Sequence, residues 1–291
     1  MSSENDKSIL RLESIKKVFF PGTMDEVAAI NDLNFVVNPM DFVTIIGSNG
    51  AGKSTLLNLV AGMYPPEKGG KIIIRGKNVT RLKEYKRAAF TGRVWQDPSA
   101  GTARNLTIEE NLSLAYSRGK CRMLRNAINK SRREHFCKAL EPLGLGLEYR
   151  LNAQVGTLSG GQRQALSLVM STISKPAILL LDEHIAALDP TTAQSVMKLT
   201  TDVVNREKIT TMMVTHDMEV ALAVGNRLIM MHKGNIILDL DEKAKNSLTI
   251  PDLISEFEKA CGTTFADDKV LLKDTKEGKA NANVPGDCAA A

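Results

Sequence analysis

The chain has 291 residues, of which 43% are apolar and 24% are charged. This is ordinary globular composition, so it excludes a fibrous repeat and a chain that is disordered over most of its length. The 38 basic and 33 acidic residues leave a net charge of +5, which is small for a nucleic-acid-binding protein, and only 4% of residues are aromatic. We therefore expect a folded protein that does not bind nucleic acid.

The start of the chain and its cysteines favour the cytosol. The sequence has no apolar stretch of the ~18 residues that a membrane-spanning helix needs. The start MSSENDKSIL lacks the basic and apolar regions of a secretory signal. The four cysteines form no CxxC pair, which argues against a zinc site and a disulfide framework. We expect a soluble protein in a reducing compartment.

The first third of the chain predicts strands around one glycine-rich loop. Residues 8–19 alternate like an edge strand, and residues 35–47 (FVVNPMDFVTIIG) predict a strand, a turn and a second strand. After the loop, residues 55–63 have apolar side chains at helical spacing, and residues 71–80 predict a further strand and turn. The order is strand, glycine loop, helix.

The rest of the chain predicts helices followed by alternating strands and helices. Residues 107–143 are largely helical in pattern, with Thr107 and Glu110 suited to a capping box. The later predicted strands and helices are strands 177–182, 210–216 and 227–231 and helices 191–207 and 218–224. Such alternation is typical of a mainly parallel sheet with helices on both faces. Beyond residue 241 the pattern predicts one amphipathic helix, PDLISEFEKAC, and then a disordered tail.

A phosphate-binding loop is the first motif that indicates chemistry. Residues 47–54 fit the pattern GxxxxGK[ST], with a predicted strand before them and a helix after them. The glycines let backbone N–H groups converge on a phosphate, Lys53 neutralises the β- and γ-phosphate oxygens, and the Ser54 hydroxyl is a ligand for Mg²⁺. The residues assigned to nucleotide binding here are Gly47, Ser48, Asn49, Gly50, Ala51, Gly52, Lys53, Ser54 and Thr55.

Two carboxylates end an apolar strand at Asp182 and Glu183. An acid pair at a strand end usually starts a loop or caps a helix, but in a chain with a phosphate loop it indicates catalysis. Asp182 then holds Mg²⁺, and Glu183 orients and deprotonates the attacking water.

Residues 158–162, LSGGQ, form a second helix start that is suited to binding an anion. Its members assigned to the nucleotide are Ser159, Gly160, Gly161 and Gln162. One ATP has only one set of phosphates, so two such helix starts make sense if each ATP lies between residues 47–54 of one subunit and residues 158–162 of another. A plain serine cap would explain Ser159 but not the glycines and the glutamine.

These motifs resemble those of ATP-binding-cassette ATPase subunits, from about Leu10 to Asp239. The resemblance implies a RecA-like P-loop NTPase core with an antiparallel β subdomain and an inserted α-helical subdomain. It divides the chain into a nucleotide-binding domain, 8–240, and a C-terminal helix and tail, 241–291. Within the domain, the core is 8–96 and 164–240, and the helical subdomain is about 97–163.

The resemblance also assigns further residues. It implies that Gln96 touches Mg²⁺ and the attacking water, that Asp189 runs along the dimer interface, and that His216 contacts the γ-phosphate. Phe19 would stack on adenine, with Phe20 as its rival and a core role as the alternative for both. Family members commonly have proline and threonine after the catalytic glutamate, whereas His184 and Ile185 stand here.

One stretch of the predicted helical subdomain is strongly basic. We call its members the basic cluster: Arg118, Lys120, Arg122, Arg125, Lys130, Arg132 and Arg133. A solvated helix face is the ordinary interpretation. The alternative is that this stretch, which in the family faces the permease, presents positive charge to anionic lipid.

The sequence thus predicts a Mg²⁺-dependent ATP hydrolase that dimerises on ATP binding and drives a separate membrane permease from the cytoplasmic face of the membrane. The resemblance favours uptake of an amino acid or similar small solute, with an extracytoplasmic substrate-binding protein as a further partner. A non-transport ATPase of the same family, and an exporter or mechanical coupler acting on lipids or lipoproteins, are the alternatives.

Overall fold

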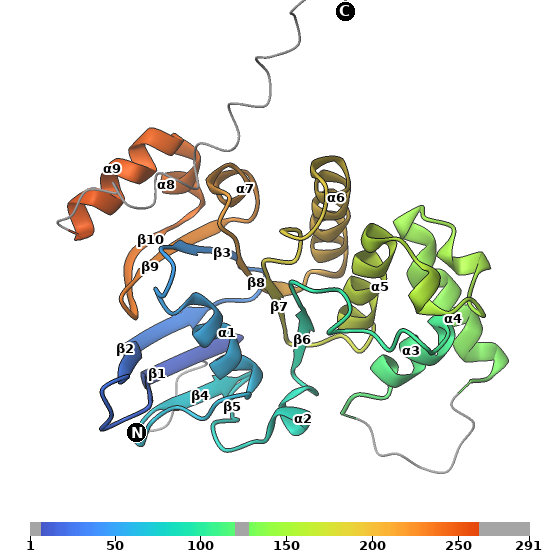
Figure 1. Ribbon diagram of the computed structural model, residues 1–291, viewed down its shortest axis with the longest axis horizontal. Helices are drawn as coiled ribbons and strands as arrows, with labels where there is room; N and C mark the ends of the chain where they lie inside the picture. Colours follow the sequence, from blue (N-terminus) through green and yellow to red (C-terminus); the bar gives the residue numbers. More distant parts are fainter. Residues whose placement is uncertain (1–6, 120–127, 262–291) are drawn as a thin grey trace, which may run out of the picture.

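The computed structural model describes residues 7–119 and 128–261. Two sheets and the helices packed on them make up this part of the chain (Figure 1). One sheet has four strands in the order β2-β1-β4-β5, and the other has six in the order β10-β9-β3-β8-β7-β6. This mixed α/β arrangement agrees with the predicted fold class.

The four-stranded sheet is antiparallel. Its strands are β1 (Leu10–Phe19), β2 (Val27–Val37), β4 (Lys71–Ile74) and β5 (Lys77–Asn78). Leu10 pairs with Val37 on one side and Ile74 on the other. All three side chains are buried, so this face of the sheet forms part of the core.

The six-stranded sheet carries the residues of interest at one edge. Its strands are β3 (Phe42–Gly47), β6 (Thr91–Val94), β7 (Ile178–Asp182), β8 (Thr210–Val214), β9 (Arg227–His232) and β10 (Asn235–Leu240). Neighbours from β6 to β9 are parallel, and β10 pairs antiparallel with β9. Because parallel strands all end at the same edge, the ends of β3, β7 and β8 bring the phosphate loop, the acid pair and His216 together.

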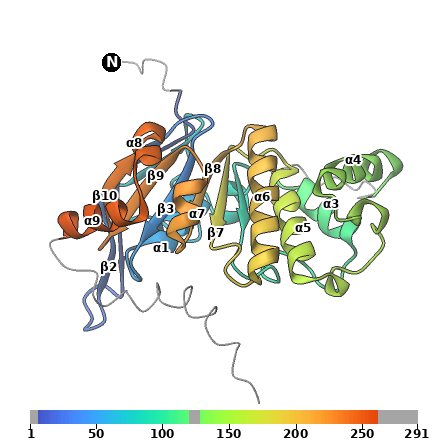
Figure 2. The same cartoon turned by 90° about the horizontal axis from the view of Figure 1, so that it is seen from above.

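Strand β7 shows why helices cover both faces of this sheet. Ile178 and Leu180 belong to the core cluster that includes α1 (Lys53–Ala61) and the antiparallel sheet. Leu179 and Leu181 belong to the cluster that includes α5 (Gly160–Thr172) and α6 (Pro190–Glu207). Successive side chains of a strand point to opposite faces, so a continuous apolar run is what a doubly covered parallel strand requires. Figure 2 shows α6 and α5 side by side beyond β7.

A separate apolar cluster holds the helical part together. The helices involved are α3 (Ile108–Tyr116), α4 (Lys130–Leu140) and α5, with short 3₁₀ turns at Glu141–Leu143, Leu147–Tyr149 and Val155–Thr157. Phe136 and Leu112 are fully buried in this cluster. The capping box predicted at Thr107 and Glu110 is confirmed, because each side chain bonds the backbone N–H of the other residue. The proposed subdomain boundaries at 97 and 163 stay predictions.

The C-terminal region contains one helix that was predicted, and a strand and a short helix that were not. Helix α9 (Ile250–Cys261) confirms the predicted helix, and Leu253 and Phe257 are buried against the core sheet and α7 (Met218–Ala223). The strand that was not predicted is β10, and the short helix is α8 (Glu242–Ser247). Helix α2 (Glu84–Arg87), earlier in the chain, was not predicted either. The predicted disordered tail, KEGKANANVPGDCAAA at 276–291, lies outside the described residues.

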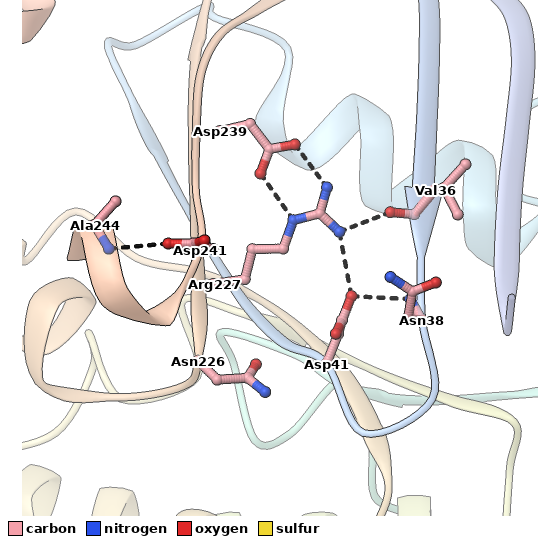
Figure 3. Close-up of a pocket in the computed structure, with 8 residues that line it drawn as sticks. All are labelled: Val36, Asn38, Asp41, Asn226, Arg227, Asp239, Asp241 and Ala244. Carbon is pink, nitrogen blue, oxygen red and sulfur yellow. Dashed lines mark hydrogen bonds and ion pairs between the residues drawn. The ribbon is translucent and has the colours of Figure 1, made fainter. Parts of the chain in front are cut away.

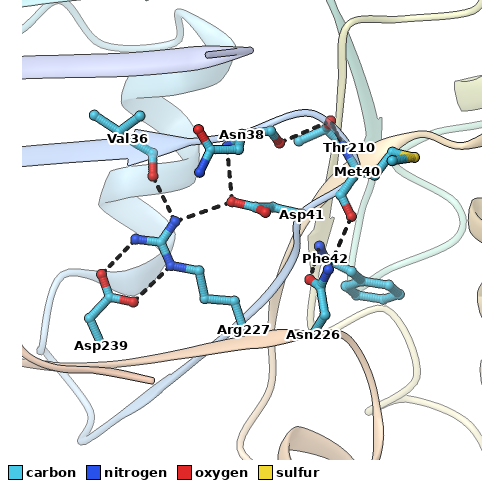
Figure 4. A network of polar contacts seen from close by, with 9 residues as sticks. All are labelled: Val36, Asn38, Met40, Asp41, Phe42, Thr210, Asn226, Arg227 and Asp239. Atoms are coloured by element: carbon cyan, nitrogen blue, oxygen red, sulfur yellow. Dashed lines mark hydrogen bonds and ion pairs between the residues drawn. The ribbon is translucent and has the colours of Figure 1, made fainter. Parts of the chain in front are cut away.

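Arg227 joins the two sheets at the edge opposite the phosphate loop (Figures 3 and 4). Its Nε and Nη2 donate to the two oxygens of Asp239 at 2.8 and 2.6 Å, and its Nη1 donates to the Val36 carbonyl of β2 at 2.8 Å and to Asp41 at 3.2 Å. These bonds hold the pKa of Arg227 above its usual value. The residues line a cavity of about 560 Å³. Because Arg227 links β9 to β10 through Asp239 and to β2 through the Val36 carbonyl, we assign it a structural role.

Within residues 7–119 and 128–261, no helix combines the length and apolar character needed to cross a membrane.

Candidate nucleotide site

The phosphate loop turns directly from β3 into α1. Gly50 and Gly52 have φ angles of 76° and 98°, in the left-handed region that favours glycine. A Cβ at Gly52 would also collide with the Ala29 carbonyl. Gly52 caps α1 without a side-chain hydrogen bond, so the first N–H groups of the helix are left for an anion.

Lys53 bends back over this loop. Its Nζ donates to the carbonyls of Gly47 at 2.7 Å and Ser48 at 3.0 Å, and the residue is only 6% exposed. The ammonium group is therefore held against the turn that would receive phosphate oxygens.

Asp182 ends β7 beside Ser54. The Ser54 hydroxyl donates to Asp182 Oδ1 at 3.3 Å, and Arg93 Nη2 donates to Oδ2 at 2.9 Å. No cluster of three His, Cys, Asp or Glu residues suited to a metal occurs among the described residues. One carboxylate and one hydroxyl fit Mg²⁺, which is usually bound through one or two carboxylates, substrate phosphates and water.

Glu183 faces His216, which follows β8. His216 Nε2 lies 2.5 Å from Glu183 Oε1. Glu183 has a φ of 46°, which is strained for a residue with a Cβ, and its N–H donates to the Val214 carbonyl at 3.1 Å. Strained backbone of this kind is held by its surroundings and clusters at active sites.

His184 is a residue of this edge whose role the sequence analysis missed. It is 2% exposed, and burial lowers its pKa to about 4. Thr200 Oγ1 donates to the Val196 carbonyl and lies 3.2 Å from His184 Nε2, so the hydroxyl is left to accept a hydrogen bond from Nε2–H. Gln164 Nε2 also donates to the His184 and Trp95 carbonyls. Partners on α5 and α6 thereby fix the segment that follows Glu183.

Gln96 and Phe19 are placed without direct support for their roles. Gln96 is exposed just beyond β6, next to the strand that carries Asp182. The Phe19 ring packs edge-on against Tyr64, with 5.3 Å between ring centroids, whereas Phe20 is 66% exposed. The roles predicted for these residues stay predictions.

The LSGGQ segment begins α5 with a capping box that joins Ser159 and Gln162. Ser159 Oγ accepts from the Gln162 N–H, and Gln162 Oε1 accepts from the Ser159 N–H, both at 3.2 Å. A capping box therefore accounts for the glutamine as well as the serine. At Gly161 a Cβ would collide with Thr192 of α6, so close helix packing also requires this glycine.

The LSGGQ segment and Asp189 lie at the starts of α5 and α6, whereas the phosphate loop lies at the start of α1. Helix α1 packs on one face of the six-stranded sheet and α5 and α6 on the other. Asp189 caps α6 by accepting from the Thr192 N–H at 3.0 Å. Hydrogen bonds from the Thr192 side chain and then from its backbone keep the pKa of Asp189 below its usual value. Its assignment to a dimer interface stays a prediction.

The basic cluster is only partly described. Lys120, Arg122 and Arg125 lie outside the described residues. Arg133 Nε and Nη2 donate to the carboxylate of Glu109 at 2.6 and 2.7 Å. One charge of the cluster is thus neutralised by an acid from α3, which reduces the positive face that the sequence suggested.

Comparisons with known proteins agree with this arrangement. A family model described as "ABC transporter" matches residues 30–186. The chain is 44% identical over 253 residues to the tyrosine transport ATP-binding protein of Clostridioides difficile (strain R20291). This alignment covers 87% of this chain and all of that protein. It is 32% identical over 234 residues to the methionine import ATP-binding protein MetN of Bartonella henselae (strain ATCC 49882 / DSM 28221 / CCUG 30454 / Houston 1), covering 79% of this chain and 64% of that one.

A solved structure shows the same fold. The dimeric post-hydrolysis state of the ATP-binding cassette MJ0796, bound to ADP and Pi, superposes with a TM-score of 0.67 at 26% identity. The match covers 80% of this chain and 98% of that one.

Proposed function

Since the chain belongs to the ABC transporter family, as an ATP-hydrolysing subunit, we propose that it drives uptake of an aromatic amino acid through a separate permease. The observation that carries the proposal is the single sheet edge that unites Lys53, Asp182 and the Glu183–His216 pair. The 44% identity to a tyrosine transport ATP-binding protein supports the choice of solute.

We assign each group at this edge a part in hydrolysis. The α1 N-terminus and Lys53 bind the phosphates. Asp182 and Ser54 would hold Mg²⁺, which would supply positive charge against the phosphate oxygens. Glu183 accepts a proton from the attacking water. His216 contacts the γ-phosphate and, at 2.5 Å from the Glu183 carboxylate, keeps that carboxylate oriented. Gln96 completes the site beside the metal and the water.

The second half of the site comes from another copy of the chain. In this proposal Ser159, Gly160 and Gly161 bind the nucleotide held by the phosphate loop of the partner subunit, with Asp189 between the two subunits. Helices α1 and α5, which begin at these two segments, pack on opposite faces of one sheet. This favours a head-to-tail dimer over one closed site. The dimeric state of the ATP-binding cassette MJ0796 supports this.

The partners in uptake are a membrane permease, at whose cytoplasmic face the chain would sit, and an extracytoplasmic substrate-binding protein. The two alternatives from the sequence, a non-transport ATPase and an exporter or coupler, gain nothing from the relatives, whose names refer to transport or import.

Radiolabelled tyrosine uptake tests the proposal. Cells lacking their own tyrosine uptake receive the chain with its permease and binding protein, or the same set with Lys53→Ala. Uptake that depends on Lys53 and is reduced by excess unlabelled tyrosine, but not by excess lysine, is the expected result. Equal uptake by both strains would contradict it.

A further inference from the structure

Arg93 is a cation inside a buried strand, directly beside the proposed metal site. It lies in β6 between Gly92 and Val94, and its side chain is 10% exposed. Nη2 donates to Asp182 Oδ2 at 2.9 Å, and Nη1 lies 3.1 Å from the Met63 sulfur. The guanidinium also stacks on the Trp95 ring, with Cζ 3.6 Å from its centroid. Three sides of the guanidinium are thus fixed.

This arrangement divides the oxygens of Asp182 between two partners. Oδ1 accepts from the Ser54 hydroxyl and Oδ2 from Arg93. A cation bound to Asp182 would therefore sit close to a guanidinium that is shielded from water. At separations of a few ångströms and an effective dielectric constant near 20, like charges repel strongly enough to change an affinity by about tenfold or more.

We propose that Arg93 is the resident countercharge of Asp182 and makes metal binding there conditional on the nucleotide. Without nucleotide, Arg93 satisfies the carboxylate and repels a divalent cation. The triphosphate adds negative charge at the same place, offsets Arg93 and lets the cation bind. Arg93 acts through Asp182 as a positioning residue, and the inference rests on the Mg²⁺ site of the proposed function.

The surroundings of Arg93 offer it a second carboxylate. Arg93 lines a cavity of about 200 Å³ together with Glu84 of α2 and Arg118. Its Nε is buried and has no hydrogen-bond partner among the described residues. Glu84 is therefore available to stabilise the guanidinium when Asp182 turns to a cation. Arg118 lines the same cavity and is a matched control, since it carries the same charge but makes no described ion pair with Asp182.

Binding of Mn²⁺ alone tests the inference without any turnover. Free Mn²⁺ is measured by electron paramagnetic resonance in the nucleotide-free full-length chain and in Arg93→Met, Arg93→Lys and Arg118→Met. We expect Arg93→Met to bind Mn²⁺ at least fivefold more tightly than the unchanged chain. The Mn²⁺ affinities of Arg93→Lys and Arg118→Met should stay within twofold of that of the unchanged chain. Adding Asp182→Asn to Arg93→Met should remove the increase in Mn²⁺ affinity.

A second readout uses the unchanged chain. Trp95 is the only tryptophan, so its fluorescence reports on the guanidinium stacked upon it. We expect ATP with Mg²⁺ to change its emission and Mg²⁺ alone to leave it unaltered.

The possible failures are distinguishable. If Arg93→Met binds Mn²⁺ no more tightly than the unchanged chain, or if its tighter binding persists when Asp182→Asn is added, Arg93 is not the countercharge of Asp182. The proposed function stands in either case. Arg118→Met with the same gain would likewise overturn the role of Arg93 as countercharge, as would a Trp95 response to Mg²⁺ alone. If the unchanged chain binds no Mn²⁺ even with ATP, the proposed metal site itself fails.

Discussion

Replacing Lys245 by Met should change how the stability of the protein depends on pH. Lys245 lies in α8 and is 1% exposed. Its Nζ donates to the Val224 and Gly225 carbonyls, just beyond the end of α7. Burial lowers the pKa of Lys245 from 10.5 to about 8, although the carbonyls at a helix end favour a cation. The Lys245 side chain therefore ties α8 to the end of α7, which begins directly after Asp217.

The size and sign of the effect follow from this shift. The folded pKa lies about 2.5 units below the unfolded value, which corresponds to about 3 kcal/mol. Between these two pKa values the unfolded chain binds a proton that the folded chain lacks, so the free energy of unfolding rises with pH. The Lys245 contribution is complete above about pH 10.5 and is lost as the pH falls towards 8.

Urea unfolding at pH 7 and at pH 10.5 measures this directly. From pH 7 to pH 10.5, the free energy of unfolding of the unchanged chain should rise by about 3 kcal/mol relative to that of Lys245→Met. Lys243→Met, which removes an exposed lysine of the same helix, should show less than about 0.5 kcal/mol of such a change. Parallel pH dependences for the unchanged chain and Lys245→Met would show that folding does not lower the pKa of Lys245.

Three further predictions concern separate parts of the chain. Thr107→Ala removes the capping box of α3 and should cost about 1 kcal/mol in urea unfolding, so an unchanged midpoint would contradict it. Phe257→Ala removes a 4% exposed ring that packs edge-on against His232 and should cost about 3 kcal/mol; a loss below 1 kcal/mol would mean that α9 contributes little. Neutralising the basic cluster should weaken association with anionic vesicles that contain the permease, and unchanged sedimentation would show it to be a solvated face.

The strand, loop and helix at residues 42–61 could be predicted from the sequence because their signals are local. A β-branched run, three glycines and an apolar helix pattern lie within one short stretch. The same holds for the Thr107 capping box, where both partners are three residues apart. Parallel pairing then follows from the alternation of strands and helices. It places Asp182, at the end of β7, at the same sheet edge as Gly47, at the end of β3, with β8 between the two strands.

His184 and Arg93 could not be understood in the same way because their partners are distant in sequence. The His184 side chain depends on Thr200, and its carbonyl depends on Gln164. Arg93 pairs with Asp182, which is 89 residues away. One signal was nevertheless available: an arginine within a short buried strand needs an anionic partner, and the neighbouring strand ends in the acid pair.

The α8 helix was missed because its stabilising contact is tertiary. Six residues with several charges give little helical pattern, and an isolated helix of this length is not stable in water. The Asp241 cap and the Lys245 contact with the end of α7 provide the missing stability. Gln162 shows the reverse case, because a local capping box also accounts for the residue. Its assignment to the nucleotide stays a prediction.

In the proposed mechanism Glu183 accepts the proton from water while other groups bind the nucleotide. Glu183→Gln keeps the shape of the side chain and removes its basicity, and ATP affinity and phosphate release are measured in this variant and in the unchanged chain. We expect the ATP affinity of the variant to stay within about threefold and its hydrolysis rate to be at least about 100-fold lower. Phosphate release at the unchanged rate would contradict it.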